Sequence, residues 1–510
     1  MIIPHDKMVH LKQTLILVIV CFAFYVGLVL RVHELLTVNQ RQRQNNILPL
    51  LEYKASPSPE EAVVSMPVLL EKSDDVPQED VLLNQNSVQN SEYFHDVVQI
   101  SQSQLQRLAE FKNRRGSEIK RDIHPSSDDT TQRSVRFVNV GGIYVYGAYL
   151  DLRQKGNFTV RILALKHDKL QDGLVCHIAD GEKHLVLYAQ AYRTCENHGK
   201  TYEGWIYSCV LPKTLKTLPS QISVFPISQR QNRSKAMKTL NLKTIPSEIN
   251  SRAEQIGVCV PPLFGNLSLS PIINFIQMCK VLGADKIFMY LGAVSSEIKK
   301  YLEFHSQSDS SLSVIHWNLP ENLSDSEDKI WYHGQLLAVQ DCLYHNMDSF
   351  SFLLFMDLDE MLVPQVANDW REMLEKIFTT QNRDSVAALS FKSAFIDPAG
   401  VPEDSENILY FQHLHRTRSV STVRKKLLVQ PLKVFELGIH HLSKALSDDC
   451  KSVDVSEKNA LLHHYHMCVK AYDPQMKCYL TKKDKRILRY KEKLTQLSHR
   501  AITDASRLFA

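Results

Sequence analysis

The stretch Phe352-Leu-Leu-Phe-Met-Asp-Leu-Asp-Glu-Met-Leu-Val-Pro364 decides the fold of this chain. Its first five residues are all apolar, which predicts a strand that is buried on both faces of a sheet. Asp357 and Asp359 follow at the carboxyl end of this strand, where open α/β sheets bind their ligands. Because side chains at i and i+2 on a strand point to the same side, we expect the two carboxylates to lie together.

Two carboxylates placed in this way are hard oxygen donors that suit Mn²⁺ or Mg²⁺. The metal would take its remaining ligands from water and from a bound diphosphate. We therefore interpret Asp357 and Asp359 as part of a metal and nucleotide-sugar site. The alternative is an acidic pair at a solvated strand end, which is common and has no chemical role. The wholly apolar strand in front of the pair favours the site.

Strands and helices alternate on both sides of this stretch. The expected strands are 258–264, 286–291, 312–317 and 385–395, and the expected helices are 270–282, 295–304, 334–345 and 369–378. Pro271 in the first turn of its helix and Gly283 after the last turn are at the positions these residues favour. The alternation predicts a mainly parallel, three-layer α/β domain over residues 256–470.

Residues 133–255 show a different pattern, because short β-branched or aromatic runs alternate with Gly, Asn, Asp and Pro turns. This pattern predicts a small β-sandwich. Cys176, Cys195 and Cys209 fall inside it, and one pair of them could form a disulfide that the spacing does not identify. The sandwich is either a carbohydrate-binding module or a packing platform for the next domain.

The amino-terminal part predicts a membrane anchor. Residues 14–30 are uncharged and mostly Leu, Ile, Val and Phe, which is just long enough to span a bilayer. We expect a signal anchor with residues 1–13 as cytoplasmic tail; a cleaved signal peptide is the alternative. Residues 31–132 are rich in Pro, Ser, Gln, Asn, Asp and Glu, which predicts a flexible stem.

Sequons and cysteines indicate that the part after the anchor is lumenal. The acceptor sequons begin at Asn157, Asn232, Asn266 and Asn322. The chain has ten cysteines, of which only Cys21 lies in the anchor. Such use of cysteine suits an oxidising compartment, so we expect a single-pass type II protein of the Golgi membrane. An odd number of cysteines leaves a free thiol, and Cys279 is expected to be a buried one.

Composition excludes some partners. The 510 residues allow two or three domains. The 60 basic and 56 acidic residues give a net charge of +4, and no basic block is interleaved with aromatic residues. Nucleic acid is therefore not an expected partner. Residues 471–510 are expected to be a tail with an exposed charged helix over 482–493, and a homodimer remains open.

Five separated motifs resemble glycosyltransferase family 92. They are Cys259-Val-Pro-Pro-Leu-Phe-Gly265, Gly334-Gln335 with Asp341-Cys342-Leu343, residues 355–364, Lys433-Val-Phe-Glu-Leu-Gly-Ile-His440 and His464-Tyr465-His466. The resemblance implies a GT-A fold, UDP-galactose as donor, a divalent cation, inversion at the anomeric carbon and a beta-1,4 linkage. It also implies that Gln335 and Pro262 contact the donor beside Asp357 and Asp359. The family's last motif usually ends in Arg, where this chain has His466.

The implied reaction moves galactose to a hydroxyl of a glycan acceptor on a glycoprotein or glycolipid. A metal would neutralise the leaving diphosphate as a Lewis acid. His464 or His466 could supply a third ligand, because i and i+2 in an extended segment face the same way and imidazole suits Mn²⁺. The alternative for this pair is a loop of satisfied histidines without a role in metal binding.

Inversion also needs a general base to take the acceptor proton. Carboxylates that follow the strand after the acidic pair are candidates: Asp397, Glu403, Asp404 and Glu406. Glu360 is expected to orient the site from the opposite face of the strand. Basic residues could hold phosphate, but for most of them we favour a solvated face: Arg418, Arg424, Lys425 and Lys426.

Two other functions remain open. The chain could be a non-catalytic lumenal or cell-surface membrane glycoprotein that binds carbohydrate through the sandwich. The intact Asp357 and Asp359 disfavour this interpretation. A metal-dependent phosphohydrolase would need a denser set of His and Asp ligands on several strand ends.

Overall fold

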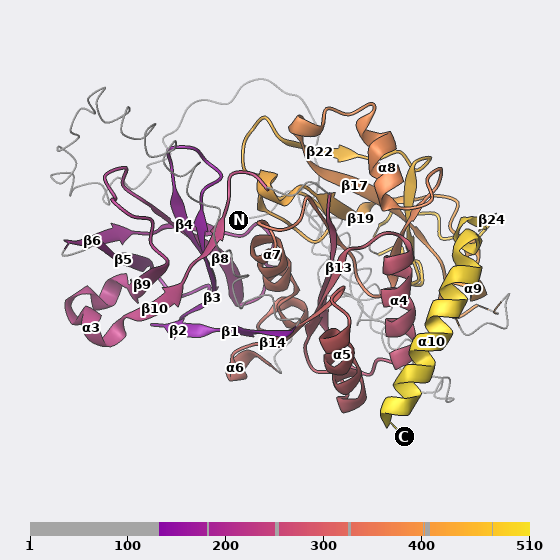
Figure 1. Ribbon diagram of the computed structural model, residues 1–510, viewed down its shortest axis with the longest axis horizontal. Helices are drawn as coiled ribbons and strands as arrows, with labels where there is room; N and C mark the ends of the chain where they lie inside the picture. The colour runs from indigo at the N-terminus through magenta and orange to yellow at the C-terminus, as the bar shows by residue number, and fades with distance from the viewer. Residues whose placement is uncertain are drawn as a thin grey trace, which may run out of the picture. The chain divides into compact units, whose positions relative to one another are not determined.

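The computed structural model describes residues 132–509, apart from 181–182, 250–253, 325–327, 401, 403–407 and 472. The fold is mixed α/β with several sheets (Figure 1). The expected tail (1–13), the expected anchor (14–30) and all but the last residue of the expected stem lie outside the described residues. Within the described ranges, no helix is both long and apolar enough to cross a membrane.

Two sheets with a shared core form the amino-terminal part, and they are antiparallel except where β11 pairs in parallel with β3. One has the order β11-β3-β4-β8-β7, with β2 beside β3, and the other has the order β10-β9-β5-β6. Their bounds are β2 (Val138–Val140), β3 (Ile143–Asp151), β4 (Thr159–His167), β5 (Leu174–Asp180), β6 (Lys183–Tyr188), β7 (Gln190–Arg193), β8 (Tyr202–Val210), β9 (Gln221–Pro226), β10 (Lys238–Asn241) and β11 (Lys243–Ile245). The Cys176–Cys209 disulfide joins β5 to β8 and so links the two sheets across the core.

The first described strand, β1 (Gln132–Arg136), belongs to a different sheet, where it pairs in parallel with β14 (Leu312–Asn318). The run from Val135 to Val140 is divided between two sheets, because β1 ends at Arg136 and β2 begins at Val138 in another sheet. The physical reason is electrostatic: Arg133 forms an ion pair with the fully buried carboxylate of Asp341. An unpaired buried charge would be costly, so this contact holds β1 at the edge of the large sheet.

The large sheet has the strand order β1-β14-β13-β12-β15-β19-β17-β23-β16, with β22 beside β17. Its other strands are β12 (Ile256–Leu263), β13 (Lys286–Leu291), β15 (Phe352–Phe355), β16 (Glu360–Pro364), β17 (Val386–Phe395), β19 (Ser421–Val429), β22 (Lys451–Asp454) and β23 (Ala460–His464). The half from β1 to β15 is parallel, as expected. β19 is antiparallel to both of its neighbours, so the other half is mixed.

Helices cover both faces of this sheet. They are α4 (Leu269–Val281), α5 (Ser296–Ser308), α7 (Gln335–His345), α8 (Trp370–Phe378) and α10 (Lys491–Phe509). Helices α4, α5, α8 and α10 contribute to one apolar cluster and α7 to the other. The α7 cluster also contains Tyr149, Leu163 and Ile206 of the β3-β4-β8 sheet. The amino-terminal sheets therefore pack on the α7 side of the large sheet.

The remaining elements are short. They are α3 (Arg233–Ala236), α6 (Glu321–Ser324), α9 (Leu409–Gln412), β18 (His415–Arg416), β20 (Val434–Glu436), β21 (Lys444–Ala445), β24 (Lys482–Lys483) and the 3₁₀ turns Ile227–Asn232, Trp331–Gly334, Arg383–Ser385, Pro431–Lys433 and Arg486–Tyr490.

The carboxyl-terminal helix differs from its prediction. It begins at Lys491, whereas Lys482–Lys483 forms β24. Helix α10 lies beside α4 (Figure 1) and buries Leu494 and Ala505 in the core. The prediction of an exposed helix rested on the run of Lys and Arg before residue 491, whereas the apolar face of α10 begins only after this run.

Six of the cysteines form disulfides within the described ranges: Cys176–Cys209, Cys259–Cys342 and Cys468–Cys478. Cys279 is free and fully buried in α4, as predicted. Burial raises the pKa of its thiol, so Cys279 stays protonated and shielded from reagents.

A buried ion pair fixes the segment before α10. Arg416 Nε donates to Asp484 Oδ2 at 2.8 Å, and His463 Nε2 lies 3.6 Å from the same oxygen. Burial opposes ionisation of Asp484, but these two partners hold its pKa well below its ordinary value. The stabilisation is therefore present above the unfolded pKa of about 3.9 and is lost as the pH falls below it.

We expect Asp484→Asn to lower the free energy of unfolding by about 2 kcal/mol at pH 7. The difference from wild type should shrink at pH 3, because the Asp484 carboxylate of the unfolded chain takes up a proton there while the folded one stays ionised. Thermal unfolding at both pH values measures this, with the exposed Asp448→Asn as control. An equal difference at both pH values would contradict the ion-pair explanation.

Candidate functional site

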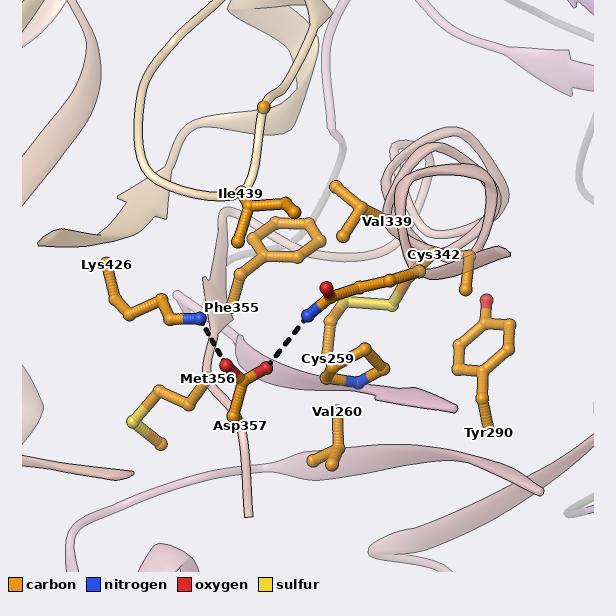
Figure 2. Close-up of a pocket in the computed structure, with 14 residues that line it drawn as sticks. Cys259, Val260, Tyr290, Val339, Cys342, Phe355, Met356, Asp357, Lys426 and Ile439 are labelled. Atoms are coloured by element: carbon orange, nitrogen blue, oxygen red, sulfur yellow. Dashed lines mark hydrogen bonds and ion pairs between the residues drawn. A yellow bond between two sulfur atoms is a disulfide. The ribbon is translucent and has the colours of Figure 1, made fainter. Parts of the chain in front are cut away.

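The strand order reverses at β12, which has β13 on one side and β15 on the other. In open α/β sheets such a switch point forms a ligand crevice outside the carboxyl ends of the strands. Pro261 near the end of β12, Asp357 just after β15 and Gln335 at the start of α7 line one pocket here (Figure 2). The topology thus places the acidic motif where a ligand is expected.

Asp357 has a partner on each oxygen. Gln335 Nε2 donates to Oδ1 at 3.2 Å, and Lys426 Nζ donates to Oδ2 at 2.6 Å (Figure 2). The Asp357 side chain is 32% exposed, whereas the Lys426 side chain is 3% exposed. The carboxylate therefore presents an open side to solvent while buried groups fix its orientation.

The strand expected over 352–356 is β15, but Asp357 and Asp359 lie in a turn between it and the next strand. β15 ends at Phe355, Glu360 N donates to the carbonyl oxygen of Asp357 at 3.1 Å, and β16 begins at Glu360 in another part of the sheet. The expectation that i and i+2 side chains share a face therefore fails. Asp357 faces Gln335 and Lys426, while Asp359 faces His464.

The second carboxylate meets the histidine motif. Asp359 is 8% exposed, and its Oδ2 lies 3.4 Å from His464 Nε2. The two come together because β16 pairs with β23 and sets Glu360 opposite His464. Burial opposes ionisation of both groups, but the opposite charges prevail, so the pKa of Asp359 is lowered and that of His464 is raised. The ring of His466 is 5.4 Å from that of His464.

Lys426 and Glu360 form a buried layer beneath Asp357. Lys426 Nζ lies 3.2 Å from Glu360 Oε2, which also accepts from Asp357 N at 2.9 Å. Glu360 is 1% exposed, and burial raises its pKa to about 7. Glu360 thus orients the motif, in agreement with its expected role. Lys426 is an exception to the solvated face expected for most of the basic residues. Its burial could have been inferred from its position directly before the buried run Leu427-Leu428-Val429.

The other predicted residues are placed as follows. Asp397 is half-buried, and its Oδ1 accepts a hydrogen bond from Ala399 N. It lies two residues after Phe395, whose ring stacks on that of His464 with the ring centres 5.0 Å apart. Glu403, Asp404 and Glu406 lie outside the described residues. Pro262 is buried near Gly292, and its neighbour Pro261 lines the pocket instead. Sequence reasoning also missed Gly438 and Ile439, which line the pocket from the loop after β20.

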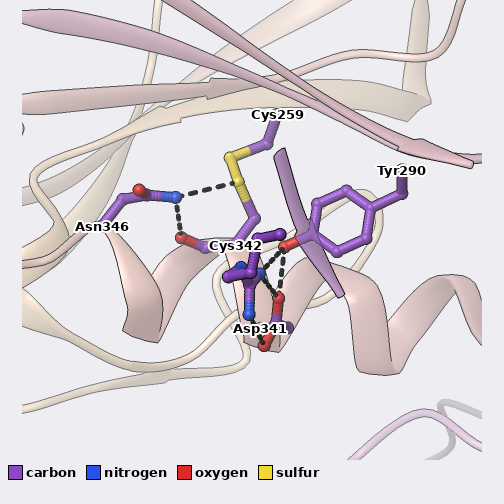
Figure 3. Close-up of a disulfide and its surroundings, with 6 residues drawn as sticks. Cys259, Tyr290, Asp341, Cys342 and Asn346 are labelled. Atoms are coloured by element: carbon purple, nitrogen blue, oxygen red, sulfur yellow. Dashed lines mark hydrogen bonds and ion pairs between the residues drawn. A yellow bond between two sulfur atoms is a disulfide. The ribbon is translucent and has the colours of Figure 1, made fainter. Parts of the chain in front are cut away.

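A disulfide and a buried carboxylate hold α7 in place. Cys259 of β12 is bonded to Cys342 of α7, and Asn346 Nδ2 donates to the Cys342 carbonyl at 2.8 Å (Figure 3). Next to them, the Asp341 carboxylate accepts from Tyr290 and Arg133. These contacts fix the position of Gln335 at the amino terminus of the helix relative to the strand end.

The donor set can be compared with the needs of a divalent cation. Within the described ranges, no three side chains of His, Cys, Asp or Glu are arranged to hold a metal. Asp359 Oδ2 and His464 Nε2 are 3.4 Å apart, slightly more than the roughly 3.0 Å between neighbouring ligands of an octahedral ion with bonds of about 2.1 Å, so a small shift would let both bind one ion. Asp357 has suitable chemistry and an open side, although both of its oxygens contact nitrogen donors.

Comparison with known proteins places this site in a family. The model of glycosyltransferase family 92 matches residues 254–506. A beta-1,4-galactosyltransferase of Caenorhabditis elegans, galt-1, is 29% identical over 68% of this chain and 78% of its own length. A galactan beta-1,4-galactosyltransferase of Arabidopsis thaliana, GALS1, is 23% identical over 42% of each chain. A second worm protein, glycosyltransferase family 92 protein F13G3.3, is 22% identical over 44% of this chain and 45% of its own.

The matched region contains β12, β15, α7, Lys426 and the histidine motif, which together build the site. The chain therefore belongs to glycosyltransferase family 92, and the family's domain occupies residues 254–506.

Proposed function

We propose that this glycosyltransferase moves galactose from UDP-galactose to a hydroxyl of a glycan acceptor, with inversion and a beta-1,4 linkage. The observation that carries the proposal is the half-exposed Asp357 at the switch point, held by Gln335 and Lys426. Two of the relatives reported above, galt-1 and GALS1, are both beta-1,4-galactosyltransferases, which supports the choice of sugar and linkage.

The donor would lie on the solvent side of Asp357. The space that the lining residues enclose is about 10 Å³, which is about enough for one water. The amino terminus of α7 is at the edge of this site, and its dipole favours a negatively charged diphosphate. Burial opposes the charge of Lys426, but the two carboxylates beside it raise its pKa and keep it protonated.

A Mn²⁺ or Mg²⁺ ion would be held by Asp359 and His464, with its remaining ligands from water and the diphosphate. When bound, such an ion supplies Lewis-acid stabilisation of the leaving diphosphate. Among the described residues, Asp397 is the candidate for the base that removes the acceptor proton, because it lies two residues after Phe395, whose ring stacks on that of His464.

The proposal is tested by incubating the full-length chain with a panel of UDP-sugars and neutral glycan acceptors. We expect transfer from UDP-galactose, with a beta-1,4 linkage in the product by NMR. Transfer of another sugar alone, or an alpha linkage, would overturn the corresponding part of the proposal. Release of UDP without any acceptor product would overturn the transferase assignment.

We expect His464→Ala to raise the Mn²⁺ concentration for half-maximal activity by roughly 10- to 100-fold, as is typical of damaged metal sites. The exposed His184→Ala, in the amino-terminal sheets, is the matched control. Binding of Mn²⁺ is measured alongside by titration. If His464→Ala binds Mn²⁺ and UDP as tightly as wild type, His464 is not a ligand.

We also propose a type II orientation in the Golgi membrane, with residues after the anchor in the lumen. The asparagines of all four sequons are exposed: Asn157, Asn232, Asn266 and Asn322. Digestion with an N-glycosidase should therefore lower the mass of the chain isolated from cells. Protease added to intact vesicles should spare residues 132–509, and complete digestion there would contradict the orientation.

A further inference from the structure

A second cavity, of about 390 Å³, lies between the amino-terminal sheets and the hairpin of β20 and β21. Its size is within the range of ligand-binding pockets. Strands β4, β7 and β8 form one wall, and the hairpin forms the other. The lining residues are Gln154, Arg161, Gln190, Ala191, Tyr192, Ser208, Phe435, Lys444, Ala445 and Leu446.

The lining is positively charged, because it includes Arg161 and Lys444 but no Asp or Glu. Arg161 Nε contacts Asp151 Oδ2 at 3.1 Å. The same carboxylate already accepts two hydrogen bonds from Arg153, at 2.8 and 2.9 Å. One carboxylate thus faces two guanidinium groups, which leaves an excess of positive charge at this wall.

Both cations of the lining lie over one aromatic ring. The Lys444 ammonium is 4.9 Å from the centre of the Phe435 ring, and the Arg161 guanidinium is 5.1 Å from it. Lys444 also lies 4.6 Å from the Tyr192 ring. The Phe435 ring thus places both cations along the lining of the same cavity, where both can attract one anion.

Neutral hydrogen-bonding groups surround the cations. Gln154 and Gln190 carry amides that can both donate and accept. The Ser208 hydroxyl accepts from Arg161 Nη1 at 2.6 Å and can donate its own hydrogen into the cavity. This combination suits a ligand that carries both hydroxyls and a negative charge.

The chain segment that forms this wall also reaches the candidate active site. Gly438 and Ile439 line the pocket beside Asp357, while residues 444–446 line the second cavity. Lys444 is five positions after Ile439 in the chain, a span of at most roughly 17 Å. Glu436 anchors the segment, since it is 1% exposed and accepts from Tyr192 Oη and Cys195 N, each at 2.7 Å.

We propose that the second cavity binds a carboxylate-bearing sugar unit of the acceptor glycan. Arg161 and Lys444 pair with the carboxylate, and Gln154, Gln190 and Ser208 bind sugar hydroxyls. The cavity is a specificity subsite that selects acidic acceptors, and as an acceptor subsite it rests on the transferase function proposed above.

Binding is tested first, without any transfer reaction. The full-length chain is titrated with a disaccharide ending in glucuronic acid, with the matching glucose-ended disaccharide and with inorganic sulfate. We expect the acidic disaccharide to bind at least roughly tenfold more tightly than either of the others. If the neutral disaccharide binds as tightly as the acidic one, the cavity does not select the carboxylate and the proposal is overturned. If sulfate binds as tightly as the acidic disaccharide, the cavity is a simple anion site and not a sugar site.

Variants localise the binding. Lys444→Gln and Gln190→Ala change exposed side chains, so both proteins should fold. We expect Lys444→Gln to weaken the acidic disaccharide by roughly tenfold and Gln190→Ala to weaken both disaccharides. The exposed Lys458→Gln, outside the cavity, is the control. Unchanged affinity in both cavity variants would overturn the proposal.

Transfer assays separate this subsite from the proposed function. With active enzyme, Lys444→Gln should raise the ratio of the KM for an acidic acceptor to that for its neutral counterpart. An unchanged ratio would overturn the subsite and leave the transferase intact. Absence of any transfer by wild type would overturn the transferase, while the titrations would still show whether the cavity binds acidic sugars.

Discussion

Asp359→Asn is expected to lower galactosyl transfer by roughly 10²- to 10³-fold while the protein stays folded. Asparagine keeps the size of the side chain but removes the charge that faces His464 at 3.4 Å. The leaving diphosphate then loses the cation that this carboxylate would hold. Folding should survive, because His464 keeps a second carboxylate nearby: its Nδ1 lies 3.8 Å from Glu360 Oε1.

The experiment compares initial rates and thermal unfolding of Asp359→Asn with those of the exposed Asp448→Asn. Folding is intact if the melting transition stays within a few degrees of wild type. Retention of more than about a tenth of the wild-type rate would show that Asp359 has no essential part in transfer.

Lys426→Met is expected to destabilise the protein by about 3 to 5 kcal/mol, because it leaves Asp357 and Glu360 without their buried counter-charge. Methionine fills nearly the same volume, so packing changes little. The loss of the ammonium also frees Asp357 from one of the two donors that orient it, so activity should fall as well.

A double variant separates the two effects. In Lys426→Met the buried Glu360 carboxylate has lost its counter-charge, and adding Glu360→Gln removes that carboxylate. The double variant should therefore recover most of the stability that the single variant loses, but not its activity. The neighbouring Lys425→Met is the control, since it breaks only the exposed pair with Asp454. A single variant as stable as wild type would contradict a buried ion-pair network.

Much of the large sheet could be predicted from the sequence. The expected strands and helices from 258 to 345 lie within a few residues of β12, α4, β13, α5, β14 and α7. The hydrophobic periodicity, with Gly and Pro residues at the ends of elements, is enough to place these elements, because each element buries one clear face. The break between Phe355 and Glu360 could not be predicted, since the apolar run resumes at once and no Gly or Pro marks the turn.

The site was predicted in its residues but not in its contacts. The pairing of β16 with β23 brings Asp359 to His464 across more than 100 positions, and only tertiary structure fixes such a pairing. Lys426 was missed for a related reason. A lysine in a basic run is usually solvated, and only the two carboxylates that surround it compensate its burial.

Titration of UDP into the full-length chain in the presence of Mn²⁺ tests the central claim most directly, because it needs no acceptor. The claim is that the turn from Asp357 to Asp359, at the switch point, binds the donor. It predicts that UDP binds wild type and that a chelator or Asp359→Asn weakens binding at least roughly tenfold. Equal affinity of UDP for wild type and Asp359→Asn in Mn²⁺ would contradict it.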